Sequence, residues 1–378
     1  MNAAVTQKTD HEKFDRSPLP ALDLLRSFAT LQVVFYHLCI ASWRVPESET
    51  YKLASLDTTL MPLLDAGWHG FVGVEIFFVI SGYIIMRSAE GVTSAGFLRG
   101  RIIRLFPSAW ICATFSLATM LIARADIAPA TLLQQYLHSM TLFPLAPWID
   151  GVYWTIGIEI AFYTIVFFVL VLGRGKEIVK LTTAIGLISG IYWLAAFHFF
   201  KIFALTNIWN RGLELSMISY GVYFALGALI YDSSHNKLKK SNLLIIGVLL
   251  IAALIEIDFK TWHNNIILQI SRSSFAPSAI FLVAMLVVCV SASWRSTPGI
   301  VKILRDVGLT TYPLYLLHNQ IGAAMIHLFS KGGVSIYWAL ALSIAFSMIL
   351  ALAVNILLEP RVKRLLLPFV NRLKQTPA

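Results

Sequence analysis

The sequence predicts an all-α, polytopic transmembrane helical bundle with about ten spans and both termini in the cytoplasm. Hydrophobic residues make up 57% of the 378 residues and charged residues only 13%, about half the charged share of an average soluble domain. Many apolar stretches reach the roughly 20 residues that a helix needs to cross a bilayer. Basic residues also concentrate on alternate connecting segments, as topology signals do.

The predicted number of spans comes from ten apolar stretches in the sequence. They cover residues 20–42, 68–86, 105–123, 151–173, 178–199, 212–231, 242–257, 274–292, 308–329 and 335–357. The chain then divides into a polar cytoplasmic segment at residues 1–19, a membrane-embedded domain at 20–360 and a basic cytoplasmic tail at 361–378.

The basic residues set the predicted orientation. With the N-terminus inside, the inner segments hold 21 lysines and arginines and the outer segments hold eight. This asymmetry explains the net charge of +10 as a topology signal, so no nucleic-acid partner is expected. The longest outer segments, 43–67 and 124–150, are candidates for a small lid. Cysteines fall only in apolar runs, which predicts no disulfide framework, and no metal-ligand spacing is found.

The first span carries two basic residues, Arg26 and His37. A charged group in hydrocarbon costs several kcal/mol, so such residues generally face a bundle interior or a watery cavity. Their spacing of eleven residues makes about three helical turns, so the two side chains share one face about 16 Å apart. The pattern places a fixed cation near the inner surface and a titratable base deep in the span.

The second span contains an intramembrane carboxylate, Glu75, and a small-residue pair, Ser81 and Gly82, toward its inner end. Small residues allow close approach of another backbone or of a slender ligand. A helix-packing notch explains the glycine equally well.

The third span opens with two arginines, Arg101 and Arg104, at its inner mouth. Residues three apart share a face of a helix, and paired guanidinium groups suit phosphate recognition. A simple topology anchor is the alternative, and it is the commoner explanation for an inner arginine cluster.

The fourth span carries Glu159 about 12 Å below its outer start, with Tyr163 one turn deeper on the same face. A buried carboxylate in a membrane is a functional candidate, and a structural salt bridge is the alternative.

The sixth and ninth spans supply further candidates. Arg211 and Glu214 are three residues apart at the start of the sixth span and are spaced to pair with each other. Tyr315 and His318 lie on one face of the ninth span near the middle of the membrane. A buried histidine is more often a hydrogen-bonded structural residue than a catalyst.

These motifs, taken in order, resemble the acyltransferase 3 family of integral-membrane acyltransferases over about residues 19 to 360. The resemblance rests on Leu22-Asp23-Leu24-Leu25-Arg26 with His37, Gly73 to Tyr83, Arg101 to Pro107, Trp154 to Glu159 with Phe162-Tyr163, Tyr315-Leu316-Leu317-His318, and Glu359-Pro360. The chain has Thr155-Ile156 where the family usually has Ser-Leu. The region around 200–230 matches less clearly, which leaves Arg211 and Glu214 without a clear counterpart.

The resemblance implies an enzyme that moves an acyl group, commonly acetyl from acetyl-CoA, onto a hydroxyl. Typical acceptors in the family are sugars of bacterial surface glycans, such as exopolysaccharide, lipopolysaccharide O-chains or Nod factors, and a lipid-linked oligosaccharide is a further option. The implied location is the bacterial inner membrane, as a multi-pass protein. The expected partners are therefore acyl-CoA, a carbohydrate acceptor and the lipid bilayer, and no metal is required.

The resemblance and the residues together suggest a path for the donor. Arg101 and Arg104 would hold the phosphates of coenzyme A at the inner mouth of the bundle. The pantetheine arm would then pass Ser81, Gly82 and Arg26 and deliver the thioester near the first-span histidine.

His37 is the expected general base, because imidazole titrates near neutral pH and can take and return a proton. The family's usual catalytic signature is the arginine-to-histidine motif of the first span. Glu159 or Glu75 would orient the ring or stabilise its charged form. Further candidates for the site are Tyr163, Tyr315, His318 and Arg211.

Two other functions remain open from the sequence. A proton-coupled transporter would use His37, Glu75 and Glu159 as a relay and would need no donor clamp, so Arg101→Ala would leave its activity largely intact. A non-catalytic component of a glycan assembly complex would tolerate His37→Ala. The sequence does not identify the acceptor or the acyl group.

Overall fold

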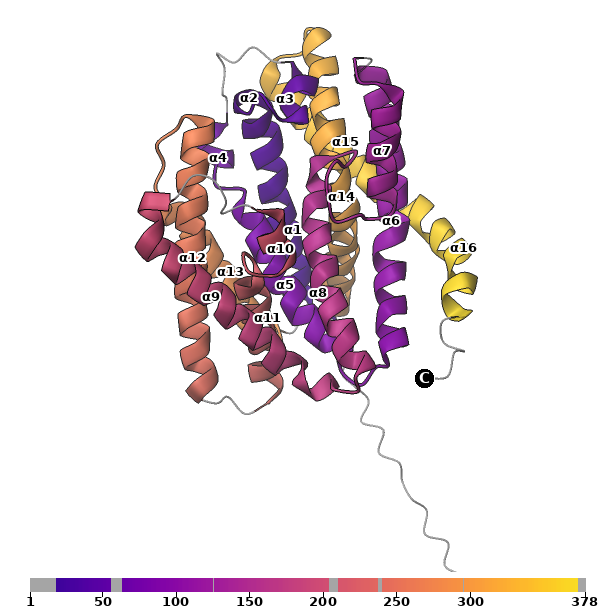
Figure 1. The fold of residues 1–378 in the computed structure, drawn as a ribbon. Helices are drawn as coiled ribbons and strands as arrows, with labels where there is room; N and C mark the ends of the chain where they lie inside the picture. The colour runs from indigo at the N-terminus through magenta and orange to yellow at the C-terminus, as the bar shows by residue number, and fades with distance from the viewer. Residues whose placement is uncertain are drawn as a thin grey trace, which may run out of the picture.

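The fold is entirely helical over the residues that the computed structural model describes, which are 18–55, 63–124, 126–203, 210–236, 240–294 and 296–372. Most long helices run roughly side by side and form a bundle (Figure 1). Seven helical segments of this part of the chain are long and apolar enough to cross a membrane. The predicted all-α transmembrane bundle is confirmed, whereas the count of ten spans and the side of the termini stay predictions.

The helices follow the predicted apolar stretches in order. The seven apolar segments are α1, η1 and α2 (Pro20–Tyr36, His37–Ala41, Ser42–Arg44), α5 (Val72–Ala89), α6 (Ser94–Ala123), η2 and α8 (Gly151–Tyr153, Trp154–Val171), η3 and α9 (Gly175–Glu177, Ile178–Phe203), α12 (Lys240–Leu268), and α15, η4 and α16 (Ile336–Ala353, Val354–Leu358, Glu359–Arg372). The other three predicted spans correspond to α11 (Gly221–His235), α13 (Phe275–Val290) and α14 (Pro298–Lys331). Short helices are α3 (Glu49–Ala54), α4 (Leu64–Gly67), α7 (Pro129–Met140) and α10 (Arg211–Leu215).

Several helices extend beyond the apolar stretches that predict them. Helix α6 begins at Ser94 rather than at 105, because the Thr93 side chain caps it by accepting a hydrogen bond from the Gly96 amide at 3.1 Å. Helix α12 continues to Leu268 rather than ending at 257. Hydrophobicity marks only the part of a helix that lies in hydrocarbon, so polar turns at either end are missed.

Helix α5 lies inside the bundle and packs closely against α11. A Cβ atom at Gly82 would lie 2.2 Å from the Phe224 carbonyl oxygen, and one at Gly227 would lie 2.0 Å from the Val79 carbonyl oxygen. The two backbones therefore meet at contact distance, which only glycine permits. The helix-packing explanation of Gly82 holds, and its predicted role in donor binding is wrong, because α11 fills the notch.

Helix α3 lies at the upper end of the bundle as drawn in Figure 1, and α7 runs beside the upper part of α6. The Thr50 hydroxyl of α3 donates to the Asn319 Oδ1 atom of α14 at 2.8 Å. Arg124, at the end of α6, binds Glu49 of α3 at 2.5 Å and Asp126 at 2.8 Å. Helices α3 and α7, which belong to the segments predicted as a lid, therefore pack on the bundle, whereas residues 56–62 and 125 of those segments lie outside the described residues.

Helix α16 follows the last long helix and diverges from the bundle (Figure 1). Its first residue, Glu359, is buried and accepts a hydrogen bond from the Ser108 hydroxyl of α6 at 2.7 Å. Residues 361–372, predicted as a basic tail, thus belong to a helix that is fixed at one end.

Candidate active site

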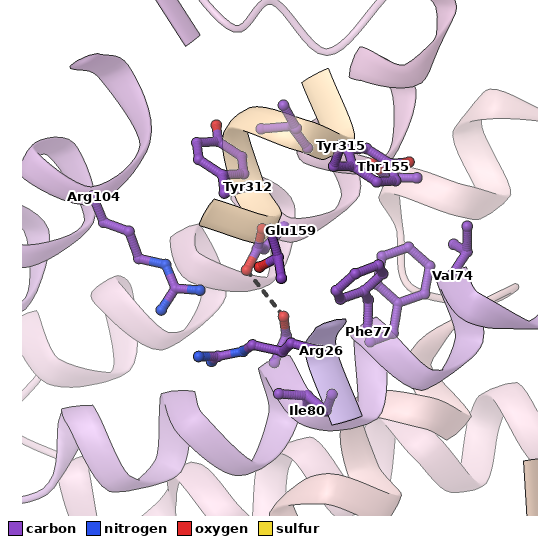
Figure 2. Close-up of a pocket in the computed structure, with 13 residues that line it drawn as sticks. Arg26, Val74, Phe77, Ile80, Arg104, Thr155, Glu159, Tyr312 and Tyr315 are labelled. Carbon is purple, nitrogen blue, oxygen red and sulfur yellow. Dashed lines mark hydrogen bonds between the residues drawn. The ribbon is translucent and has the colours of Figure 1, made fainter. Parts of the chain in front are cut away.

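A polar pocket of about 80 Å³ opens among α1, α5, α6, α8 and α14 (Figure 2). Five of the predicted site residues reach it from five different helices, namely Arg26, Ser81, Arg104, Glu159 and Tyr315. The rest of the wall consists of Val74, Phe77, Phe78, Ile80, Thr155, Ile156, Thr311 and Tyr312. The pocket therefore gathers two guanidinium groups and one carboxylate inside an otherwise apolar bundle.

Glu159 is held by two hydroxyl groups. The Ser81 Oγ atom of α5 donates to Glu159 Oε1 at 3.0 Å, which Figure 2 shows as a dashed line, and the Tyr163 hydroxyl donates to the same oxygen. Two donors on one oxygen hold the carboxylate in place at the pocket wall. Ser81 thus contributes to the site through Glu159.

The two arginines of α6 line different cavities. Arg104 lines the pocket, whereas the Arg101 guanidinium carbon lies 5.4 Å from the ring centres of both Phe97 and Tyr163. Arg101 lines a second, mostly apolar groove of about 330 Å³ between α6 and α8. A shared role of the two arginines in phosphate binding stays a prediction.

A histidine pair lies where α1 meets α14. The Nδ1 atom of His37 is 3.0 Å from the Nε2 atom of His318, and the ring centres are 5.0 Å apart. His37 is partly exposed and begins the π-helical turn η1, a feature that is frequent at functional sites. His318 is fully buried. The sequence names both histidines, but their contact joins residues 281 positions apart and no local pattern predicts it.

The predicted carboxylate partner of His37 is not found among the described residues. Glu75 is fully buried and forms an ion pair with Lys260 of α12, and Glu159 binds Ser81 and Tyr163. Neither carboxylate contacts His37, because each is already bound to a neighbour on another helix.

Sequence analysis missed Lys260, the partner of Glu75. The lysine ammonium lies 5.8 Å, 5.9 Å and 5.4 Å from the ring centres of Phe71, Trp154 and Tyr220. These rings favour the cation electrostatically, so the pair joins α5 to α12 as a structural salt bridge. Hydropathy alone assigns this lysine to an outer connecting segment, because α12 extends past the apolar stretch 242–257 that predicts it.

Tyr315 separates the pocket from the histidine pair. Its ring centre lies 5.8 Å from that of Phe77, a pocket residue, and 5.9 Å from that of His318. Its hydroxyl accepts a hydrogen bond from Thr155 Oγ1 at 3.0 Å. Tyr315 therefore lies between the pocket, which holds the guanidinium groups, and the imidazole pair.

Arg211 has a structural role. It donates to the carbonyl oxygens of Pro144 at 2.8 Å and Trp154 at 2.9 Å, and it pairs with Glu214 at 2.7 Å. The local pairing that its spacing suggests is confirmed, and Arg211 fastens a connecting segment to the start of α8.

A second polar cluster, which sequence analysis did not single out, lies beside the histidine pair. Asp150 accepts hydrogen bonds from Asn319 Nδ2 at 2.7 Å and from the Val152 amide at 3.1 Å. Asp150 precedes the apolar segment of α8, and burial raises its pKa to about 6. Its position directly before a predicted span is a helix-cap signal that could have identified it.

The fold and the pocket define a membrane-embedded protein with a basic, histidine-containing site. The chain belongs to the acyltransferase 3 family, since the family model described as an acyltransferase domain matches residues 19–359. The protein is therefore a membrane acyltransferase.

Known relatives support this assignment. The chain is 26% identical over 347 residues to nodulation protein 10 of Rhizobium leguminosarum bv. viciae, which covers 84% of this chain and 85% of the relative. It is 26% identical over 314 residues to a protein named as a membrane-bound transacylase, BcsY, of Komagataeibacter xylinus, with 77% of each chain covered. No solved structure matches.

Proposed function

We propose that the chain transfers an acyl group, most simply acetyl, from acetyl-CoA to a hydroxyl of a carbohydrate. The acceptor class is an exopolysaccharide, a lipopolysaccharide O-chain or a lipid-linked oligosaccharide, and the location is the bacterial inner membrane. The observation that carries the proposal is a pocket with two arginines, whose wall residue Tyr315 also contacts an imidazole pair. The name of one relative, a membrane-bound transacylase, agrees with acyl transfer at a membrane.

The donor would enter at the arginines of the pocket. Arg26 and Arg104 are the pocket's two cations, and guanidinium groups bind phosphate oxygens in bidentate fashion. A pocket of about 80 Å³ has room for a thioester end, so the nucleotide would lie outside it. The Nε and Nη1 atoms of Arg101 are buried and have no hydrogen-bond partner among the described residues, which supports a phosphate contact for it at the margin of this site.

The transfer would use His37 as general base. His37 takes the proton of the acceptor hydroxyl, and the oxygen attacks the thioester carbonyl carbon. The new C–O bond forms, the C–S bond breaks, and the thiolate leaves with the proton that His37 returns. The Tyr315 hydroxyl accepts from Thr155 and has no acceptor for its own proton among the described residues, so it is the candidate donor to the oxyanion.

The alternative of a proton relay gains no support from the geometry. Its three members lie in separate networks in the described part of the chain: His37 with His318, Glu75 with Lys260, and Glu159 with Ser81 and Tyr163. A relay needs members within hydrogen-bond reach of one another or of bridging water.

The test uses purified protein in nanodiscs, radiolabelled acetyl-CoA and a membrane-glycan extract. His37→Ala should reduce label transfer by about 100-fold or more, as expected for loss of a general base. The matched control is His138→Ala, since His138 is a partly exposed histidine of α7 whose ring contacts the Leu145 carbonyl. Donor binding, measured with coenzyme A itself, should persist in both variants.

Two outcomes would contradict the proposal. Transfer that survives in His37→Ala would remove the histidine from its role as base. Absence of donor binding and transfer in the wild type, across several acyl-CoAs and acceptors, would contradict the proposed reaction itself.

A further inference from the structure

We infer that His318 is a positioning residue, which holds His37 in the tautomer that carries its proton on Nδ1 and leaves Nε2 free to act as the base. The inference rests on the proposed function, since it concerns the nitrogen of His37 that would accept the acceptor's proton. It follows from the partners of the four ring nitrogens, taken one at a time.

The proton of His318 is placed by two backbone carbonyl groups. Its Nδ1 atom lies 3.1 Å from the Leu314 oxygen and 2.9 Å from the Tyr315 oxygen. Carbonyl oxygens only accept hydrogen bonds, so Nδ1 must carry the proton. A neutral imidazole has one ring proton, so Nε2 of His318 presents a lone pair.

The lone pair of His318 then determines the tautomer of His37. The Nδ1 atom of His37 is 3.0 Å from His318 Nε2 and 3.1 Å from the Val33 carbonyl oxygen. Both neighbours are acceptors, so Nδ1 of His37 is the protonated nitrogen and Nε2 is bare. No described residue makes a hydrogen bond to this Nε2 atom, and the His37 side chain is partly exposed.

Close helix packing keeps the two rings in register. A Cβ atom at Gly322, one turn after His318, would lie 2.8 Å from the Leu38 side chain, so α14 approaches the η1 turn at this level. Asn319 is bound to Thr50 and to Asp150, which fixes α14 directly next to His318. His318, the orienting group, is therefore held in place by three contacts of its neighbours on α14: Gly322 with Leu38, and Asn319 with Thr50 and with Asp150.

A histidine suits this position better than a carboxylate would. In serine hydrolases a buried carboxylate orients the catalytic histidine and stabilises its charged form. A neutral imidazole supplies the same acceptor without adding a permanent charge to the interior of the bundle, where an unpaired charge is costly. When His37 takes up a proton, its hydrogen bond to His318 becomes charge-assisted and stronger.

The first experiment reads the tautomer directly and needs no substrate. Protein labelled with ¹⁵N-histidine in nanodiscs is compared as wild type, His318→Leu and His318→Gln, and the His37 signals are identified by their loss in His37→Gln. The wild type should show a protonated Nδ1 and a bare Nε2. His318→Leu should populate the opposite tautomer, and His318→Gln should restore the wild-type pattern, because its side-chain oxygen can accept from His37.

The second experiment measures release of coenzyme A from acetyl-CoA with simple sugars as acceptors. His318→Leu should lower kcat by about 10- to 100-fold, the usual cost of losing an orienting partner, with KM for acetyl-CoA changed less than about twofold. His318→Gln should recover most of kcat. A residue that only supports the fold would lose activity in both variants.

The outcomes separate the inference from the proposed function. A wild-type His37 protonated on Nε2, or a tautomer pattern that is the same in His318→Leu, overturns the inference even if transfer is observed. A wild type with the expected tautomer but no transfer supports the inference and contradicts the proposed function. If His318→Leu fails to fold, the wild-type and His318→Gln spectra still decide the question.

Discussion

Tyr163 joins the charged groups of the site. Its hydroxyl donates to Glu159, and its ring lies 5.4 Å from the Arg101 guanidinium, while Arg104 lines the pocket with Glu159. One side chain thus contacts both the carboxylate and one of the two cations of α6.

Removal of the hydroxyl alone tests this role. In Tyr163→Phe the ring remains over Arg101, but Glu159 loses one of its two donors. A hydrogen bond to a charged group is worth about 1.5–3 kcal/mol, so acetyl transfer should fall by about 10- to 100-fold. Steady-state kinetics would measure the change, with Tyr337→Phe as the control because Tyr337 is 60% exposed. Equal activity in both variants would contradict a role for the hydroxyl in holding Glu159.

At the scale of the helices, the position of the site depends on how closely α5 packs against α11. Ser81 points from α5 into the pocket wall, while its neighbour Gly82 contacts α11. The close backbone contact therefore sets how far Ser81 lies from Glu159.

An added methyl group would test this packing. In Gly82→Ala the new Cβ would lie 2.2 Å from the Phe224 carbonyl oxygen, and such overpacking costs about 1–3 kcal/mol. The unfolding midpoint in detergent should fall. Gly100→Ala on α6 is the matched control, since its Cβ would meet no described atom within 4 Å. The control should be neutral or slightly stabilised by helix propensity; similar midpoints for the two variants would refute the close contact.

Helix α16 has two exposed surfaces of different character. Arg361, Arg364 and Arg372 are exposed on one side, and Leu365 and Phe369, exposed by 73% and 67%, lie beside them. This arrangement is typical of a helix that lies in the membrane interface, with apolar groups in the acyl region and cations at anionic headgroups.

Charge removal on α16 should weaken the response to anionic lipid. The wild type should gain thermal stability when phosphatidylglycerol replaces neutral lipid in nanodiscs, since each basic residue near such a surface contributes about 1 kcal/mol. Replacing the three α16 arginines with glutamine should remove most of that gain. The equal-charge control places glutamine at Arg174 and Lys176 of the α8–α9 connection and at Lys180 in the first turn of α9. An equal loss in both triple variants would show that the effect is not specific to α16.

At the scale of the whole molecule, the buried cluster around Asp150 connects the covering segments to the bundle. Asp150 and Thr50 both bind Asn319, so α3, α14 and the start of α8 meet at one point. Because Asn319 follows His318 directly, this connection also supports the candidate catalytic pair.

Stability should depend on pH through this cluster. Burial raises the pKa of Asp150 from its ordinary 3.8 to about 6, so the folded state binds this proton more tightly than the unfolded state does. The contribution of Asp150 is then most favourable below about pH 4, decreases as the pH rises and is constant above about pH 6. Asp150→Asn has no such titration. The difference in unfolding midpoint between wild type and variant should therefore change between pH 4 and 6; a constant difference would contradict the shift.

Much of the fold follows from the sequence, whereas the contacts between helices do not. Apolar length locates the helices, and the spacing of Arg26 and His37 correctly places both on the interior of α1. The pairing of His37 with His318 could not be predicted. Helix periodicity shows which side chains share one face of a helix, but it does not show which other helix packs against that face. Lys260 lies past the apolar stretch 242–257 that predicts α12, so hydropathy does not single it out.

The pairing of Glu75 with Lys260 also has a consequence for biogenesis. The two residues are 185 positions apart, so at roughly 5–20 residues per second a ribosome delivers the acid about 10 to 40 seconds before its partner. During that interval Glu75 of α5 has no lysine with which to form its ion pair. The ion pair between α5 and α12 therefore forms only after α12 has been synthesised, and a chain truncated before α12 should be less stable in the membrane than the full chain.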